Sequence, residues 1–154
     1  MKAYLSGAIE DAPDSGGRWR EEMSLWLKGT LQHDVFNPVE KEKTLLTEEE
    51  LKNFRLWKTD DYDRFKKVVQ KIIREDLDSL VNQTDYVICL WDEHVLAGGG
   101  THGEVTLSYH LGIPVYTVLG MPRRKVSSWI LGCCTQEFES FDDLRGFLEE
   151  RYGG

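Results

Sequence analysis

A glycine-rich stretch, Ala97-Gly-Gly-Gly-Thr-His-Gly-Glu104, combines residue types that suit an attack on a sugar. An apolar run from Tyr86 to Trp91 precedes it, and an amphipathic segment from Val105 to Leu111 follows it. This order predicts a strand, a loop and a helix start, with Glu104 in the first helical turn. A helix N-terminus favours negative charge, so we expect Glu104 to be ionised. Glycines let a ligand approach the backbone closely, and an ionised carboxylate beside them can act as a nucleophile.

The same stretch has two other interpretations. Thr101 and Glu104 have the spacing of a capping box, in which the carboxylate only reaches back to a backbone N–H. The glycines from Gly98 to Gly103 match the spacing of a dinucleotide-binding fingerprint. That fingerprint is disfavoured, because the loop follows the third predicted strand and is too long for a tight turn. The residues about twenty positions further on are Arg123 and Arg124, not the acid that a ribose hydroxyl requires.

Short apolar segments alternate with helical patterns along the chain. Strands are predicted over residues 2–6, 33–36, 86–91, 115–119 and 136–139, and helices over 19–31, from 47 onward, over 61–81, 101–111 and 140–152. Strict alternation is typical of a parallel sheet with helices on both faces. We therefore predict an α/β, flavodoxin-like (Rossmann-like) fold with strand order 2-1-3-4-5, in a single domain over residues 1–154.

Ligands of such sheets bind at the C-terminal ends of the strands, near the point where the strand order reverses. The loops at that edge are residues 7–17 and 92–101, and both are rich in glycine. The segment 40–61 is long, charged and aromatic. It is either a lid over the site or a packed connecting segment, and the sequence leaves both interpretations open.

Composition restricts the kinds of partner. The chain has 154 residues, 40% of them hydrophobic and 30% charged, and a net charge of -8, which disfavours a nucleic-acid partner. It contains no apolar run of membrane-spanning length and no signal-peptide pattern. Its three cysteines are Cys89 and the adjacent pair Cys133-Cys134, which fits a reduced, cytoplasmic protein. No Cys or His spacing resembles a metal site. We expect a small-molecule ligand, no metal, no cofactor and no membrane.

Motifs spread over most of the chain resemble those of the nucleoside 2-deoxyribosyltransferase family, which includes relatives that hydrolyse 2'-deoxynucleoside 5'-monophosphates. Each motif is weak alone, and their order and spacing carry the resemblance. They are Tyr4-Leu-Ser-Gly-Ala-Ile9, Asp76-Leu-x-x-Leu80 ahead of Thr84-Asp85, Gly100-Thr-His-Gly-Glu104, Gly112-Ile-Pro-Val115 and Ser127-Ser-Trp-Ile-Leu-Gly132. The glycine loop also partly resembles the lysine-decarboxylase-like phosphoribohydrolases, but Ala97 replaces a glycine of that loop and the chain is short for that family.

The resemblance to the deoxyribosyltransferases implies roles for particular residues. Glu104 matches the nucleophile that attacks the anomeric carbon, and Tyr4 matches the tyrosine that orients this carboxylate. Asp76 matches the aspartate that lies at the base and helps to protonate it as it leaves. Members of the family are homo-oligomers whose sites borrow a residue from the neighbouring subunit, and Ser127 falls at that position.

Reasoning from the residues agrees with these roles. Breaking an N-glycosidic bond develops oxocarbenium character, which a carboxylate stabilises or captures. The departing base needs a proton, so a second carboxyl group with a raised pKa is useful. Asp76 lies at the edge of the helical stripe that contains Ile72 and Ile73, and we expect it to point inward. The alternative is a surface acid paired with Lys71 or Arg74.

The deoxyribosyltransferases and the monophosphate hydrolases differ in whether they recognise a phosphate. The monophosphate hydrolases have serine and arginine just after the glycine of the first-strand loop, where this chain has Ala8 and Glu10. Glu10 would repel a phosphate, which favours an unphosphorylated nucleoside. Against this, Ser127 resembles the hydrolases, and Arg18 or Arg20 could reach into the site. The choice between nucleoside and monophosphate, and between transfer and hydrolysis, stays open at this point.

We predict an enzyme that cleaves the N-glycosidic bond of 2'-deoxynucleosides through a glycosyl–Glu104 intermediate and transfers the sugar to another nucleobase. The alternatives are an N-glycoside hydrolase of (deoxy)nucleoside 5'-monophosphates and a catalytically silent nucleotide-binding module. The expected partners are a nucleoside or nucleotide, a free nucleobase and further copies of the chain. Besides the catalytic Glu104, Asp76 and Tyr4, the predicted substrate-binding residues are Gly7, Ala8, Glu10, Asp92, Gly98, Gly100, Thr101, His102 and, from the neighbouring subunit, Ser127.

Overall fold

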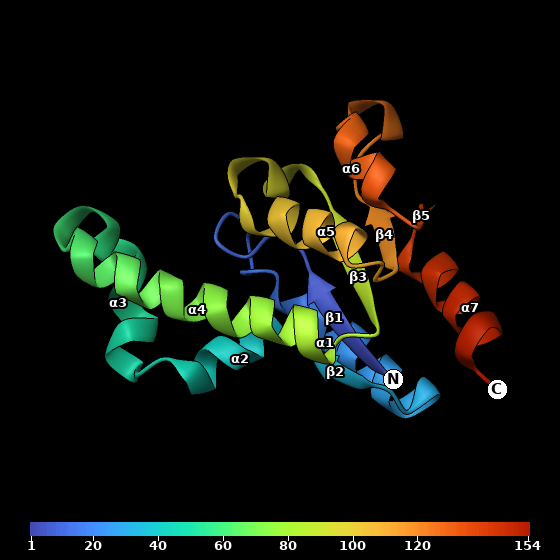
Figure 1. The fold of residues 1–154 in the computed structure, drawn as a ribbon, viewed down its shortest axis with the longest axis horizontal. Helices are drawn as coiled ribbons and strands as arrows, with labels where there is room; N and C mark the ends of the chain where they lie inside the picture. The colour runs from blue at the N-terminus through green and yellow to red at the C-terminus, as the bar shows by residue number, and fades with distance from the viewer.

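A parallel sheet of five strands runs through the centre of the protein, in the order β2-β1-β3-β4-β5 (Figure 1). The computed structural model describes all of residues 1–154. The predicted strand order is therefore confirmed, and β1 lies between β2 and β3 where the order reverses. The strands are β1 (Lys2–Ser6), β2 (Asp34–Phe36), β3 (Tyr86–Trp91), β4 (Val115–Leu119) and β5 (Gln136–Phe138).

Helices cover both faces of this sheet, because alternate residues of each strand bury apolar side chains on opposite sides. On one face Tyr4 of β1 belongs to a core shared with α4, α5 and α6. On the other face Ala3 and Leu5 of the same strand pack with α1 and α7. The helices are α1 (Gly17–Trp26), α2 (Pro38–Leu45), α3 (Glu48–Asp60), α4 (Tyr62–Gln83), α5 (Gly100–His110), α6 (Ser128–Cys133) and α7 (Phe141–Tyr152).

Helix boundaries mostly follow the sequence patterns. The helix expected over 19–31 is α1 followed by a π-helical turn, Leu27–Leu31. Helix α7 begins after Ser140, whose hydroxyl accepts from the Asp143 N–H at 3.1 Å. The short helix α6 was not anticipated. None of the helices has the length and apolar character needed to cross a membrane.

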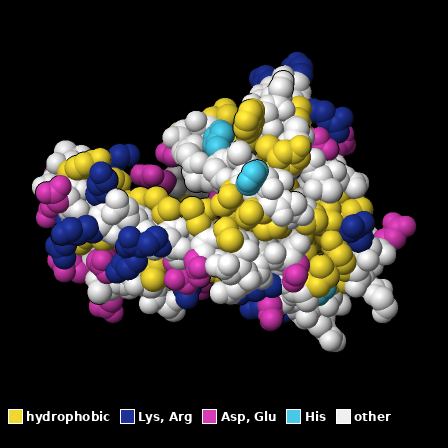
Figure 2. Space-filling view, in the orientation of Figure 1, with side chains coloured by type: hydrophobic (Ala, Val, Ile, Leu, Met, Phe, Trp, Pro, Cys, Tyr) yellow, Lys and Arg dark blue, Asp and Glu magenta, His cyan; other side chains and the backbone are white.

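The segment 40–61 forms most of α2 and α3, and these helices pack against α4 as an arm beside the sheet (Figure 1). The arm has a small core of its own, made by Leu46, Phe54 and Val68. Charged side chains of both signs are spread over the visible surface of this arm, with hydrophobic side chains between them (Figure 2). The segment is thus a packed helical connection, and it carries one wall of the cavity described below.

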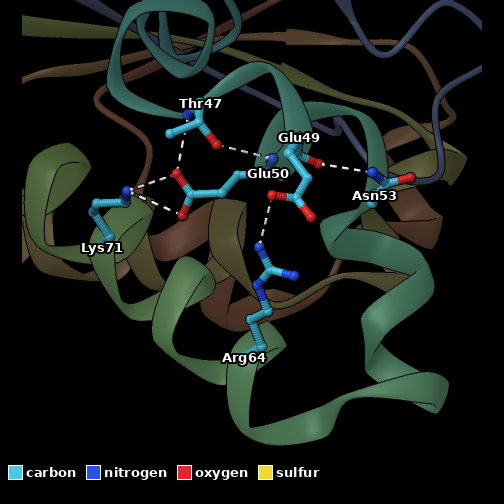
Figure 3. Close-up of polar contacts among 6 residues, drawn as sticks. All are labelled: Thr47, Glu49, Glu50, Asn53, Arg64 and Lys71. Atoms are coloured by element: carbon cyan, nitrogen blue, oxygen red, sulfur yellow. Dashed lines mark hydrogen bonds and ion pairs between the residues drawn. The ribbon is translucent and has the colours of Figure 1, made fainter.

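A capping box starts helix α3 and also ties it to α4 (Figure 3). The Thr47 hydroxyl accepts from the Glu50 N–H at 3.1 Å, and the Glu50 carboxylate accepts from the Thr47 N–H at 3.0 Å. The same carboxylate binds Lys71 of α4 at 3.0 Å. A second ion pair, between Glu49 and Arg64 at 3.0 Å, links the helices further along.

We expect Thr47→Ala to lower the free energy of unfolding by about 1 kcal/mol, because it leaves orphan N–H groups at the start of α3. Urea denaturation of the two proteins measures the difference. Thr44→Ala is the matched control, since Thr44 is exposed on α2 and caps no helix start; its effect should stay within about 0.5 kcal/mol. Equal losses for both variants would contradict a capping role for Thr47.

Candidate active site

Two hydroxyl groups hold the carboxylate of Glu104. Tyr4 donates a hydrogen bond to Oε2, and Ser6 donates one to Oε1 at 2.7 Å. Tyr4 and Ser6 lie two residues apart on β1, so both side chains point to the face that α5 covers. Stacking on Phe36, with ring centroids 5.1 Å apart, fixes the Tyr4 ring. Both oxygens of the Glu104 carboxylate are therefore positioned by one strand.

The capping-box interpretation of Thr101 and Glu104 is wrong. Helix α5 begins at Gly100, its N-cap residue is Gly99, and no side chain caps it. Glu104 is consequently the fifth residue of the helix, two positions later than a capping box on Thr101 would place it. Its carboxylate bonds to the hydroxyls of β1 and to no backbone N–H of the helix start. Hydrogen bonds from the neighbouring strand β1 thus take the place of the predicted bond to a backbone N–H of the same helix.

Asp76 of α4 lies across the same cavity, whose volume is about 230 Å³. Ile72 and Ile73 line the cavity with it, as the predicted inward orientation requires. The alternative ion pair does not form: Lys71 binds Glu50 instead, and Asp76 belongs to no ion pair. Most of the predicted site residues meet in this cavity, namely Gly7, Ala8, Glu10, Asp76, Gly98, Gly100, Thr101 and Glu104.

Burial and neighbouring charge raise the pKa of Asp76 to about 8. Burial contributes most, followed by the negative charges of Glu104, Glu42 and Glu75, while Arg20 acts in the opposite direction. Two carboxyl groups that share a site do not ionise together, and the second proton is held more tightly. With a pKa of about 8, Asp76 carries a proton near neutral pH, and the negative charge of Glu104 favours that protonated form.

The environment of Glu104 acts on its pKa in two directions. Burial has the largest effect and raises the pKa of Glu104 above its usual value, while the hydrogen bonds from Tyr4 and Ser6 and the charge of Arg20 oppose that rise. The expectation that the helix N-terminus alone keeps Glu104 ionised is therefore incomplete, because burial opposes ionisation and the two hydroxyls offset part of that cost. Burial and the Glu104 charge also raise the pKa of Tyr4, so its phenol stays a proton donor to the carboxylate.

Four predicted residues do not line the cavity. One is Tyr4, which reaches the site through its hydrogen bond to Glu104. Asp92 caps the turn after β3, where its carboxylate accepts from the backbone N–H of His94 at 3.0 Å. His102 packs edge-on against Trp91, with ring centroids 4.8 Å apart. Ser127 is exposed at the start of α6, so its role in the site of a neighbouring subunit stays a prediction.

Neither arginine that was considered for phosphate binding reaches the cavity. Arg18 is exposed and pairs with Glu22 at 3.1 Å on the outer side of α1. Arg20 is completely buried and binds backbone carbonyl groups instead. The sequence position of these residues close to the first loop gave no guide to where their side chains point.

Ser6, Glu42 and Arg55 are site residues that the sequence reasoning missed. The two-residue repeat of β1 could have found Ser6, because Tyr4 was already placed on that face. Glu42 of α2 and Arg55 of α3 line the cavity with 3.9 Å between their charged groups. Burial raises the pKa of Glu42. No local pattern places these two residues, since they reach the cavity only through the packing of the arm.

The glycines after β3 leave the mouth of the cavity open. A side-chain carbon at Gly98, Gly99 or Gly100 would meet no protein atom within 4 Å. A short 3-10 helix, Glu93–Ala97, separates them from the strand, so this is not the tight turn of a dinucleotide-binding loop. No three His, Cys, Asp or Glu side chains are grouped as metal ligands.

Solved structures with this fold include two bacterial proteins. One is a 2-deoxyribosyltransferase from the psychrotolerant bacterium Bacillus psychrosaccharolyticus, with a TM-score of 0.65, 22% identity, and coverage of 94% of this chain and 90% of that chain. The other is a conserved protein from Enterococcus faecalis V583, with a TM-score of 0.63, 15% identity and coverage of 98% of both chains. No family model and no curated protein matches the sequence. At these identities the likeness establishes the shared fold.

Proposed function

We propose that the protein cleaves the N-glycosidic bond of a 2'-deoxynucleoside, with Glu104 as nucleophile and Asp76 as proton donor, and transfers the deoxyribosyl group to another nucleobase. One observation carries the proposal: a carboxylate held by Tyr4 and Ser6 shares a cavity with a second carboxyl group whose pKa is raised to about 8. The fold that the chain shares with a 2-deoxyribosyltransferase supports the choice of a deoxyribosyl group.

In the first step, a carboxylate oxygen of Glu104 forms a bond to the anomeric carbon of the sugar. The bond between that carbon and the base breaks, and its electron pair leaves with the base. Asp76 gives its proton to the departing nitrogen and becomes a carboxylate. The products are a glycosyl ester on Glu104 and a free base.

In the second step, a nitrogen of another base attacks the same anomeric carbon. The attacking base gives its proton to the Asp76 carboxylate, the ester bond breaks, and Glu104 becomes a carboxylate again. Asp76 thus acts as acid and then as base, for which a pKa near the working pH is favourable. Water in place of the second base would release free deoxyribose, so hydrolysis passes through the same intermediate.

Product analysis tests the proposal directly. The protein is incubated with a deoxynucleoside and a different free base, and the products are separated by chromatography. A new deoxynucleoside that contains the added base is the expected result. Free deoxyribose without exchange would replace transfer by hydrolysis. No turnover of any deoxynucleoside or deoxynucleotide would overturn the proposal and favour a binding module.

The charges that line the cavity favour an unphosphorylated substrate. The acidic residues are Glu10, Asp11, Glu42, Glu104 and the protonated Asp76, and Arg55 is the one lysine or arginine among the lining residues. Arg55 already faces Glu42 at 3.9 Å. A phosphate at the 5' end of the sugar would add negative charge to a wall that offers it few cations.

We therefore expect a higher kcat/KM for a deoxynucleoside than for its 5'-monophosphate. Glu10→Arg should shift the ratio of the two kcat/KM values toward the monophosphate by about tenfold or more, because it replaces repulsion by attraction. Glu149→Arg on α7 is the control, since it changes the net charge equally far from the cavity. Side-by-side kinetics decide the matter, and a clear wild-type preference for the monophosphate would contradict the charge argument.

A further inference from the structure

Arg20 of α1 buries a positive charge without an ion-pair partner. Its side chain is 0% exposed, and its guanidinium donates to the backbone carbonyls of Gly7 at 2.7 Å, Gly16 at 2.9 Å, Ala8 at 3.2 Å and Leu5 at 3.3 Å. No carboxylate lies within ion-pair distance. Burying a cation in this way is costly, so its retention points to an interaction beyond the four carbonyl groups.

The loop around Arg20 packs closely against the guanidinium. Gly16 has a φ of 67°, and a side-chain carbon there would lie 2.2 Å from a guanidinium nitrogen of Arg20 and 2.4 Å from the Ala8 carbonyl oxygen. The Trp19 ring packs 4.8 Å from the guanidinium carbon. Arg20 is thus fixed at the end of β1, the strand that also carries Tyr4 and Ser6, the two hydrogen-bond donors to Glu104.

Titratable groups of four elements surround this buried cation. Burial lowers the pKa of Arg20, and the charge of Glu104 is the largest opposing influence, ahead of Tyr4, Cys89 and Asp76. The guanidinium nevertheless remains protonated at any physiological pH. The interaction is mutual, since the Arg20 charge lowers the pKa of Glu104. Geometry places the two groups near each other, because the guanidinium binds the carbonyls of Leu5 and Gly7 on either side of Ser6, whose hydroxyl donates to Glu104. The two side chains do not form a salt bridge.

The other charged groups around Glu104 do not supply this effect. The acidic residues of the cavity wall oppose a further negative charge, and burial favours the neutral forms of Tyr4 and Cys89. Arg55 lies in the wall formed by the arm and faces Glu42. The titratable and charged side chains on the remaining wall are Glu10, Asp11 and His94. Arg20 is thus the buried cation near Glu104, and it forms no direct ion pair with a carboxylate.

We propose that Arg20 is a positioning residue, whose fixed positive charge beside the end of β1 favours the ionised form of the Glu104 carboxyl group without contacting the substrate. The relevance to turnover rests on the proposed function, in which Glu104 is the nucleophile. The electrostatic effect on Glu104 does not depend on turnover and can be measured in the isolated protein.

Carbon-13 NMR titration of the glutamate carboxyl groups tests this inference, with Glu104→Gln identifying the Glu104 signal. We expect Arg20→Gln to raise the pKa of Glu104 by about one unit, because a full charge is lost in a region of low polarity. Arg20→Lys keeps the charge and should leave the pKa within about half a unit of the wild-type value. Arg18→Gln, an exposed change on the same helix with the same loss of charge, should not shift it.

An unchanged Glu104 pKa in Arg20→Gln would overturn the inference. If that variant does not fold, Arg20→Lys decides, since a rise of about a full unit despite the retained charge would show that only the hydrogen bonds matter. In kinetics, the acidic limb of the kcat/KM profile should move to higher pH in Arg20→Gln, and not in Arg18→Gln. Because the NMR measurement needs no substrate, a failure here is distinct from a failure of the proposed reaction.

Discussion

Glu104→Gln is expected to lower kcat/KM by at least about ten-thousand-fold, because it removes the nucleophile and its negative charge together. The amide keeps the shape of the side chain, and its oxygen accepts a hydrogen bond from one of the hydroxyls of Tyr4 and Ser6, while its NH2 group donates to the other hydroxyl oxygen. The loss should therefore appear in turnover rather than in folding. Base-exchange kinetics measure turnover, and urea denaturation measures the free energy of unfolding.

Glu93→Gln provides the matched control for this prediction. Glu93 is exposed in the loop after β3 and does not line the cavity, so the same chemical change there should leave kcat/KM close to the wild-type value. A folded Glu104→Gln protein with near-full activity would remove the central role assigned to this carboxylate. The comparison separates the chemistry of Glu104 from a general effect of lost negative charge.

The fold could be predicted from the sequence because each strand is a short apolar run between helical patterns. The strand over 86–91 and the helix over 61–81 appear almost at their predicted bounds, as Tyr86–Trp91 and Tyr62–Gln83. Parallel sheets force this alternation, since every connection must cross a face of the sheet. The carboxyl ends of β1 and β3 then bring their two glycine-rich loops to one edge, where the cavity lies.

The details of the site depended on contacts that local patterns do not encode. Thr101 and Glu104 satisfy the spacing of a capping box, yet hydrogen bonds from β1 hold the carboxylate instead. Arg20 was considered near a phosphate, although its spacing to Met23 and Leu27 puts it on the buried stripe of the helix. The sequence therefore contained this helical spacing as a sign that Arg20 is buried. Nothing comparable predicts Glu42, which reaches the cavity through the packing of α2.

Asp76→Asn is expected to lower kcat/KM by about a hundredfold to ten-thousandfold with little change in substrate affinity, because the departing base loses its proton donor. A substrate whose base leaves readily without a proton should recover much of the lost rate. Asp78→Asn on the exposed side of the same helix is the control and should behave like the wild type. Kinetics on one ordinary and one activated substrate measure the difference.

The pH profile provides a second readout of the same group. A proton donor with a pKa of about 8 is protonated below that pH and loses its proton above it, so wild-type kcat/KM should fall as the pH rises through about 8. This basic limb should disappear in Asp76→Asn, because the amide has no proton to lose, and it should weaken with the activated substrate. Equal losses for good and poor leaving groups, with the limb retained, would mean that Asp76 only positions the base. If both the dependence on the leaving group and the basic limb of the pH profile are lost in Asp76→Asn, Asp76 is the proton donor.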